Sequence, residues 1–165
     1  MKRILICHDG HEITTKGTID YIKGLKEPCS ITLFHVLEPV PPELQEHGGT
    51  EEEAEETRKA RIAWISENSA KVRANLERCR KKIEEITGSK AEIKIVPSFM
   101  INDFIPLLEE ELKAEHYDEV VIIHHTDSWL KNLLDETWAG KAERIISGVK
   151  LTIVRCSEGK GVCFI

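Results

Sequence analysis

Residues 3–11 read Arg3-Ile4-Leu5-Ile6-Cys7-His8-Asp9-Gly10-His11, a short apolar run that ends abruptly in polar and turn-forming residues. A β-prone run of this length is typical of a buried strand, and the polar cluster marks the loop at its carboxyl end. Apolar residues then recur at helical spacing over residues 12–25. The stretch therefore predicts a strand followed by a helix, the opening unit of an α/β fold.

Strand and helix patterns continue to alternate along the chain. Further strands are predicted over residues 30–37, 91–96, 119–124 and 150–155, and further helices over 58–87, 102–112 and 139–147. With right-handed crossovers, this order predicts a single-domain, doubly wound, parallel five-stranded sheet with helices on both faces. Residues 157–165 are predicted to form a hairpin extension, in which 162–165 return as an antiparallel edge strand.

Composition limits the classes of protein to consider. The chain has 165 residues, 41% of them hydrophobic and 32% charged, which is enough for the core of one domain. Its formal net charge of −6 argues against partners such as nucleic acids or anionic membranes. No apolar run approaches the ~20 residues of a membrane span, and the N-terminal run is too short for a signal peptide. Five cysteines without a C-x-x-C pair indicate reduced thiols and predict a cytoplasmic protein.

A long helix is predicted in the middle of the chain. Residues 41–57 begin with the last two residues of a proline cluster and are then rich in glutamate, which predicts a flexible acidic linker. Over 58–87, apolar residues fall on three- and four-residue steps up to Gly88, which predicts an amphipathic helix roughly 45 Å long. That length exceeds what a small sheet covers, so the helix must bend, break or protrude. We interpret its apolar stripe as core or dimer seam, and its surface as a candidate site for a protein partner.

Several segments, in order along most of the chain, resemble the universal stress protein family. They are residues 4–11, 33–36 (Leu-Phe-His-Val), 96–105 and 117–123, followed by 139–146 and the strand at 150–155. The resemblance implies a small α/β sandwich that is often a homodimer through its last strand. It also implies a nucleotide site at the carboxyl ends of the strands, where Asp9 contacts the nucleotide and the Val36 backbone meets the adenine.

The loop after the fourth predicted strand departs from the family. ATP-binding members carry Gly-x-x-Gly, nine residues, and then Gly followed by Ser or Thr. Here the loop begins His124-His125-Thr126-Asp127 and lacks the first glycines, while Gly140 aligns with the last pair. The departure predicts that tight ATP binding is lost, and leaves open an adenine nucleoside, a nucleotide such as AMP, or no nucleotide.

These observations predict a non-catalytic module of stress-response signalling that binds a small ligand. Its cleft is expected at the ends of the first and fourth strands. The residues expected to form it are Asp9, Gly10, Val36, His124, His125 and Gly140.

Two alternatives use the histidines. His8, His11, His124 and His125 would converge at the strand ends and suit Zn²⁺ or a similar ion. His8-x-Gly10-His11 also matches the His-x-Gly-His motif of nucleotidyltransferases, whose imidazoles stabilise charge on the transferred phosphate.

The cysteines are interpreted as inert. Cys7 lies in a predicted buried strand, where a thiol fills space as a small apolar group. Cys156 and Cys163 would face each other across the predicted hairpin, but only Lys160 offers a nearby positive charge to activate either thiol.

Overall fold

The structure is a computed structural model that describes residues 1–45, 49–98, 104–125, 149–157 and 162–164. Its elements are β1 (Lys2–Cys7), α1 (Glu12–Lys23), β2 (Cys29–Val36), the short 3₁₀ helix η1 (Pro42–Leu44), α2 (Glu51–Thr87), β3 (Glu92–Val96), α3 (Phe104–Ala114), β4 (Glu119–His125), β5 (Lys150–Ser157) and β6 (Val162–Phe164). The predicted helix over 139–147 lies outside the described residues.

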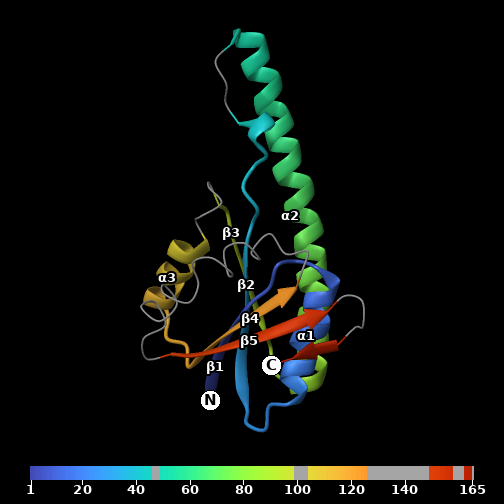
Figure 1. Ribbon diagram of the computed structural model, residues 1–165, viewed down its shortest axis with the longest axis vertical. Helices are drawn as coiled ribbons and strands as arrows, with labels where there is room; N and C mark the ends of the chain where they lie inside the picture. Colours follow the sequence, from blue (N-terminus) through green and yellow to red (C-terminus); the bar gives the residue numbers. More distant parts are fainter. Residues whose placement is uncertain (46–48, 99–103, 126–148, 158–161, 165) are drawn as a thin grey trace.

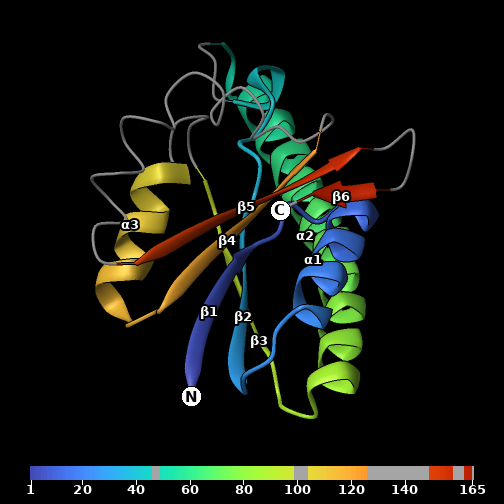
Figure 2. The same cartoon turned by 60° about the horizontal axis from the view of Figure 1, so that its bottom comes forward.

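The strands form one sheet in the order β3-β2-β1-β4-β5-β6, with β1 to β5 parallel (Figures 1 and 2). β6 pairs antiparallel with β5, as the sequence predicts for the end of the chain. The chain builds outward from β1 to β3 and then crosses to β4 on the other side of β1, which defines a doubly wound sheet. The predicted α/β fold, with its additional edge strand, is confirmed.

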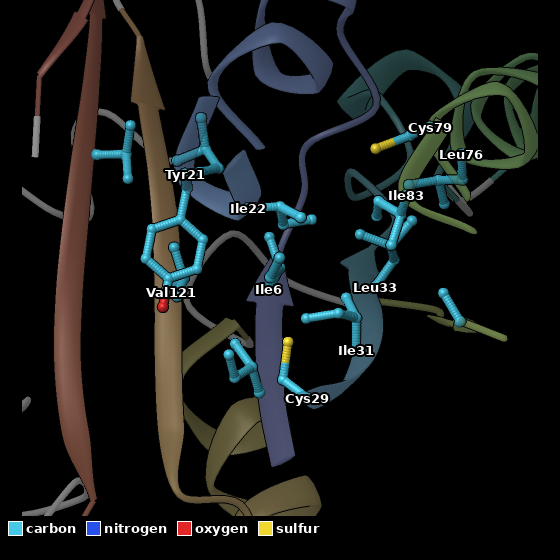
Figure 3. Close-up of a cluster of buried hydrophobic side chains, with 14 residues drawn as sticks. Ile6, Tyr21, Ile22, Cys29, Ile31, Leu33, Leu76, Cys79, Ile83 and Val121 are labelled. Carbon is cyan, nitrogen blue, oxygen red and sulfur yellow. The ribbon is translucent and has the colours of Figure 1, made fainter. Parts of the chain in front are cut away.

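Alternate residues of each central strand supply two separate cores. The core beneath α1 and α2 takes Ile4 and Ile6 from β1 together with Leu76, Cys79 and Ile83 from α2 (Figure 3). The opposite core, beneath α3, takes Leu5, Cys7, Phe34, Val120 and Ile122 from intervening strand positions, together with Phe104 and Leu108 from α3, among others. Successive side chains of a strand point to opposite faces, so one apolar run serves both layers.

α2 is 37 residues long and begins at Glu51, so residues 51–57 are helical and not part of a linker. The helix starts early because Thr50 and Glu53 form a reciprocal capping box, which satisfies amide groups at the helix start. It ends at Gly88, which has a φ of 70°. Only its second half packs on the sheet, and its first half protrudes beyond the strand ends (Figure 1). The predicted excess length thus appears as a protruding arm.

A buried carboxylate lies where β1 and β4 begin, at the amino-terminal ends of the strands. Glu119, 1% exposed, lies 2.7 Å from the Lys2 ammonium and accepts a 2.6 Å hydrogen bond from the Thr152 hydroxyl. Burial, the largest single influence, would raise the pKa of Glu119, but the hydrogen bonds from its neighbours, with Lys2 first, and the Lys2 charge together lower the pKa. In the described part of the chain, no helix is both long and apolar enough to cross a membrane.

Candidate ligand-binding cleft

A cleft of about 1100 Å³ opens at the carboxyl ends of the parallel strands. Its described lining comes from the end of β2, from the loops that follow β1, β2 and β3, from the start of α1, and from residues of α2 between Arg61 and Arg78. Ligands of open α/β sheets bind at this edge, because loops diverge there at the switch in strand order. The lining reaches the loop after β3, further than the sequence predicts, and residues of α2 between Arg61 and Arg78 form one wall.

Asp9 organises the turn between β1 and α1. Its Oδ1 atom accepts hydrogen bonds from the His11 amide, at 3.0 Å, and from the Thr14 hydroxyl. The carboxylate therefore holds the start of α1 in place, where a negative charge interacts favourably with the helix dipole. Asp9 is 5% exposed and lines the cleft, as the sequence analysis expects.

Gly10 allows α2 to approach this turn. Its φ of 89° is a conformation that residues with a Cβ rarely adopt. A Cβ at this position would also lie only 3.2 Å from a methyl group of Val72 on α2. The Asn75 side-chain amide donates a 2.6 Å hydrogen bond to the Gly10 carbonyl. The glycine thus joins the β1 loop to the α2 wall of the cleft.

His8 is directed into the fold and does not line the cleft. It is 2% exposed; Nδ1 accepts a hydrogen bond from the Gly10 amide at 2.9 Å, and Nε2 lies 3.0 Å from the Thr15 hydroxyl. Acceptance at Nδ1 leaves the proton of the neutral ring on Nε2, which donates to Thr15. Both nitrogens are therefore engaged, and His8 offers no free atom to a metal ion or a phosphate.

This geometry bears on both histidine alternatives. Among the residues whose positions are described, no group of three or more His, Cys, Asp or Glu side chains is placed to hold a metal ion. His11 precedes the first turn of α1 and lines the cleft without His8 beside it. The His-x-Gly-His motif therefore does not present two imidazoles to one ligand.

His35, on β2, is a cleft residue that the sequence analysis missed. Its Nδ1 lies 2.6 Å from the His8 carbonyl oxygen and donates to it, which fixes the ring proton on Nδ1. Burial lowers the pKa of His35, so the ring is neutral at physiological pH. Nε2 of the neutral ring is then an acceptor, on a residue that lines the cleft.

The α2 wall is the larger part of the site that sequence reasoning did not find. Trp64, Ile65 and Val72 supply apolar surface to it. The apolar stripe interpreted as core or dimer seam is divided: Leu76, Cys79 and Ile83 are buried core, whereas Ile65 and Val72, nearer the start of the helix, line the cleft. The feature of the sequence that could have indicated this wall was the length of the predicted helix, which exceeds what the sheet can cover.

The remaining predicted residues are placed as follows. Val36 is buried in the core beneath α3, while its neighbours His35 and Leu37 line the cleft. His124 and His125 end β4 beside β5, and the structure does not describe their side chains. Gly140 lies outside the described residues. Of the six predicted cleft residues, Asp9 and Gly10 belong to the part of the lining that the structure describes.

Comparisons with known proteins address the fold. No protein-family model and no curated protein sequence matches the chain. A universal stress protein family member from Burkholderia pseudomallei superposes with a TM-score of 0.57 over 92% of this chain and 94% of its own, at 11% identity. The chain has the fold of the universal stress proteins. A second such structure, a universal stress protein in complex with cAMP, matches with a TM-score of 0.51 at 14% identity, with coverage of 92% and 94%.

At 11% and 14% identity, the similarity to universal stress proteins establishes the fold. The choice of ligand must be argued from the residues of the cleft. The coverage of more than nine-tenths of both chains means that the likeness extends over the whole domain. The cleft lies at the carboxyl edge of the sheet, the edge where the physics of parallel strands places ligands.

Proposed function

We propose that this protein is a non-catalytic ligand-binding module of universal stress protein type, and that its cleft binds an adenine nucleoside or nucleotide. The observation that supports this proposal is the cleft at the strand ends, whose lining combines Asp9 and His35 with apolar side chains of α2. Its volume of about 1100 Å³ is ample for a ligand of this size. The neighbour whose structure contains cAMP supports the choice of an adenine compound.

Each part of the cleft suits one part of such a ligand. The indole of Trp64 and the side chain of Ile65 offer surface on which a purine base can pack. Nε2 of His35 can accept a hydrogen bond from an amine or a hydroxyl group. The carboxylate of Asp9 suits the hydroxyl groups of a ribose.

The charges of the lining favour ligands with few phosphates. Three cationic and three anionic side chains are present: Arg61, Lys71 and Arg78, with Asp9, Glu12 and Glu38. Their formal charges cancel, so the described lining offers no net attraction to a triphosphate. Together with the missing glycines after β4, this balance supports adenosine, AMP or cAMP over ATP.

Two isoleucines of α2 provide a matched test. Ile62 and Ile65 are 58% and 41% exposed, so neither is needed for the core, but only Ile65 lines the described cleft. In calorimetric titrations with adenosine, AMP, cAMP and ATP, we expect Ile65→Glu to weaken binding by about tenfold, or roughly 1.4 kcal/mol. Ile62→Glu should bind like the wild type. Equal affinities of the two variants, or absence of binding by the wild type, would contradict the proposal.

The same proposal includes a homodimer in the cytoplasm. Two surfaces support self-association: the protruding half of α2, with exposed Ile62, and β6, which stands at one end of the sheet. Native mass spectrometry of the untagged protein would report subunit number and any retained ligand together. A monomer at micromolar concentration would contradict this part of the proposal while leaving the cleft untouched.

A further inference from the structure

The antiparallel pairing of β5 with β6 places two cysteines directly opposite each other. In the register of this pair, Cys156 faces Cys163, flanked by the pairs Arg155–Phe164 and Ser157–Val162. Directly opposed residues of antiparallel strands lie on the same face of the sheet, with Cα atoms roughly 4.5–5.5 Å apart. That interval lies within the range of roughly 4.4–6.8 Å that a disulfide spans.

We propose that Cys156 and Cys163 form a reversible disulfide that fastens β6 to β5. The oxidant is a low-molecular-weight disulfide such as oxidised glutathione. The thiolate of one cysteine attacks the glutathione disulfide and releases one glutathione thiolate. The second cysteine then attacks the mixed disulfide and releases the other. The protein loses two electrons and two protons, and two molecules of glutathione are formed.

The other described cysteines are protected from this reaction. Cys7, Cys29 and Cys79 are buried, each at most 6% exposed. Burial raises the pKa of the Cys7 thiol to about 12 and that of Cys79 to about 11, which suppresses the reactive thiolate. They also belong to the two cores, beneath the helices. Oxidation is therefore directed to the terminal hairpin.

The disulfide would change the hold on the last strand. β6 has only three residues, it lies at an end of the sheet, and it is held by β5 and by contacts with α1. Such a short strand opens readily when only hydrogen bonds retain it. A covalent link between paired positions limits that opening. The hairpin is thus a clip that an oxidising environment closes and a reducing one releases.

The test equilibrates the full chain with glutathione buffers of increasing oxidised fraction, followed by acid quenching, alkylation of remaining thiols under denaturing conditions, and peptide mass spectrometry. We expect an intramolecular Cys156–Cys163 link, with the three buried cysteines alkylated. Cys163→Ser should instead trap a glutathione adduct on Cys156, while Cys29→Ser should leave link formation unchanged. Glutathione adducts on both cysteines of the wild type without a link, or a link between two chains, would overturn the proposal.

Two further measurements test whether the strand pairing promotes the disulfide and whether the disulfide holds β6 in place. In concentrated guanidinium chloride, the link should require a more oxidising buffer than in the folded chain, because unfolding removes the alignment. Equal midpoints would overturn the inference. In the folded chain, amide exchange over 162–164 should slow by about tenfold or more on oxidation. Unchanged exchange would show that the bond does not secure the strand.

Discussion

Asn75 on α2 donates a hydrogen bond of 2.6 Å to the carbonyl oxygen of Gly10, 65 residues earlier in the chain. The bond joins the protruding helix to the loop at the end of β1, at the wall of the cleft. Gly10 in turn donates its amide to His8, whose carbonyl oxygen accepts from His35. One chain of hydrogen bonds thus runs from α2 through β1 to β2.

Loss of the Asn75 bond should be measurable against a neighbour on the same helix. Asn68 makes its hydrogen bond to Trp64 within α2, one turn away. Asn75 also accepts a hydrogen bond from Arg78 on the same helix, just as Asn68 makes one to Trp64. Because Asn→Ala gains similar helix propensity at both sites and removes one bond within the helix at each, the difference between the two variants is assigned to the tertiary bond. We expect Asn75→Ala to be less stable by about 1 kcal/mol in urea unfolding. Equal stabilities would show that the bond contributes nothing.

Substitution of Gly10 should be costly for two independent reasons. Gly10→Ala would place a Cβ in a backbone of φ 89° and within 3.2 Å of Val72. We expect a loss of about 1–3 kcal/mol in the free energy of unfolding. Gly24→Ala is the control, because Gly24 ends α1 with φ −81° in right-handed geometry. It should change stability by less than about 1 kcal/mol; a comparable loss there would argue against backbone strain at Gly10.

His35 should make the fold sensitive to mild acid. Because burial lowers its pKa in the folded state, the unfolded chain binds the proton first as the pH falls below ~6.5. The folded state therefore loses stability from that pH down to the folded-state pKa. His35→Asn retains a donor toward the His8 carbonyl but does not titrate. Urea unfolding between about pH 7.5 and 5 should give a steeper loss for the wild type; parallel curves would contradict the prediction.

Replacement of an apolar side chain by alanine should affect stability differently in the two halves of α2. Leu76 is fully buried in the core beneath α1 and α2, whereas Ile62 on the arm is 58% exposed. Leu76→Ala should cost about 2–5 kcal/mol, because it leaves a cavity in a packed core. Ile62→Ala should stay within about 0.5 kcal/mol of the wild type in the same urea titration. A large loss at Ile62 would reveal that the arm is covered by another surface, such as a second subunit.

The local pattern of apolar and polar residues was sufficient to predict the strands of the sheet. The apolar runs at β1 and β4 are unbroken, and such runs occur where both faces of a parallel strand are covered. The polar residues after β1 correctly indicated the strand end at which the cleft opens. The start of α2 was misplaced, because residues 51–57 hold no apolar periodicity. The capping box of Thr50 and Glu53 was the signal that could have placed it.

The site could be predicted only where its residues lie beside that strand end. Asp9 and Gly10 are such residues. For His35 and Val36, the sequence did not indicate which of the two lines the cleft. Alternation directs these two neighbours to opposite faces of β2, but which face bears the cleft depends on the path of α2 over the strand ends. Trp64 and Ile65 likewise acquire their role from that path.

By itself, then, the sequence determined the strands, the two apolar faces and the order of the elements, because periodicity and turn residues act over short distances. The tertiary structure alone decided that Trp64 and Ile65 of α2 line the cleft while Cys79 and Ile83 belong to the core, and that His8 is engaged within the fold. Those relationships join residues through packing and strand register, which arise only when distant segments meet.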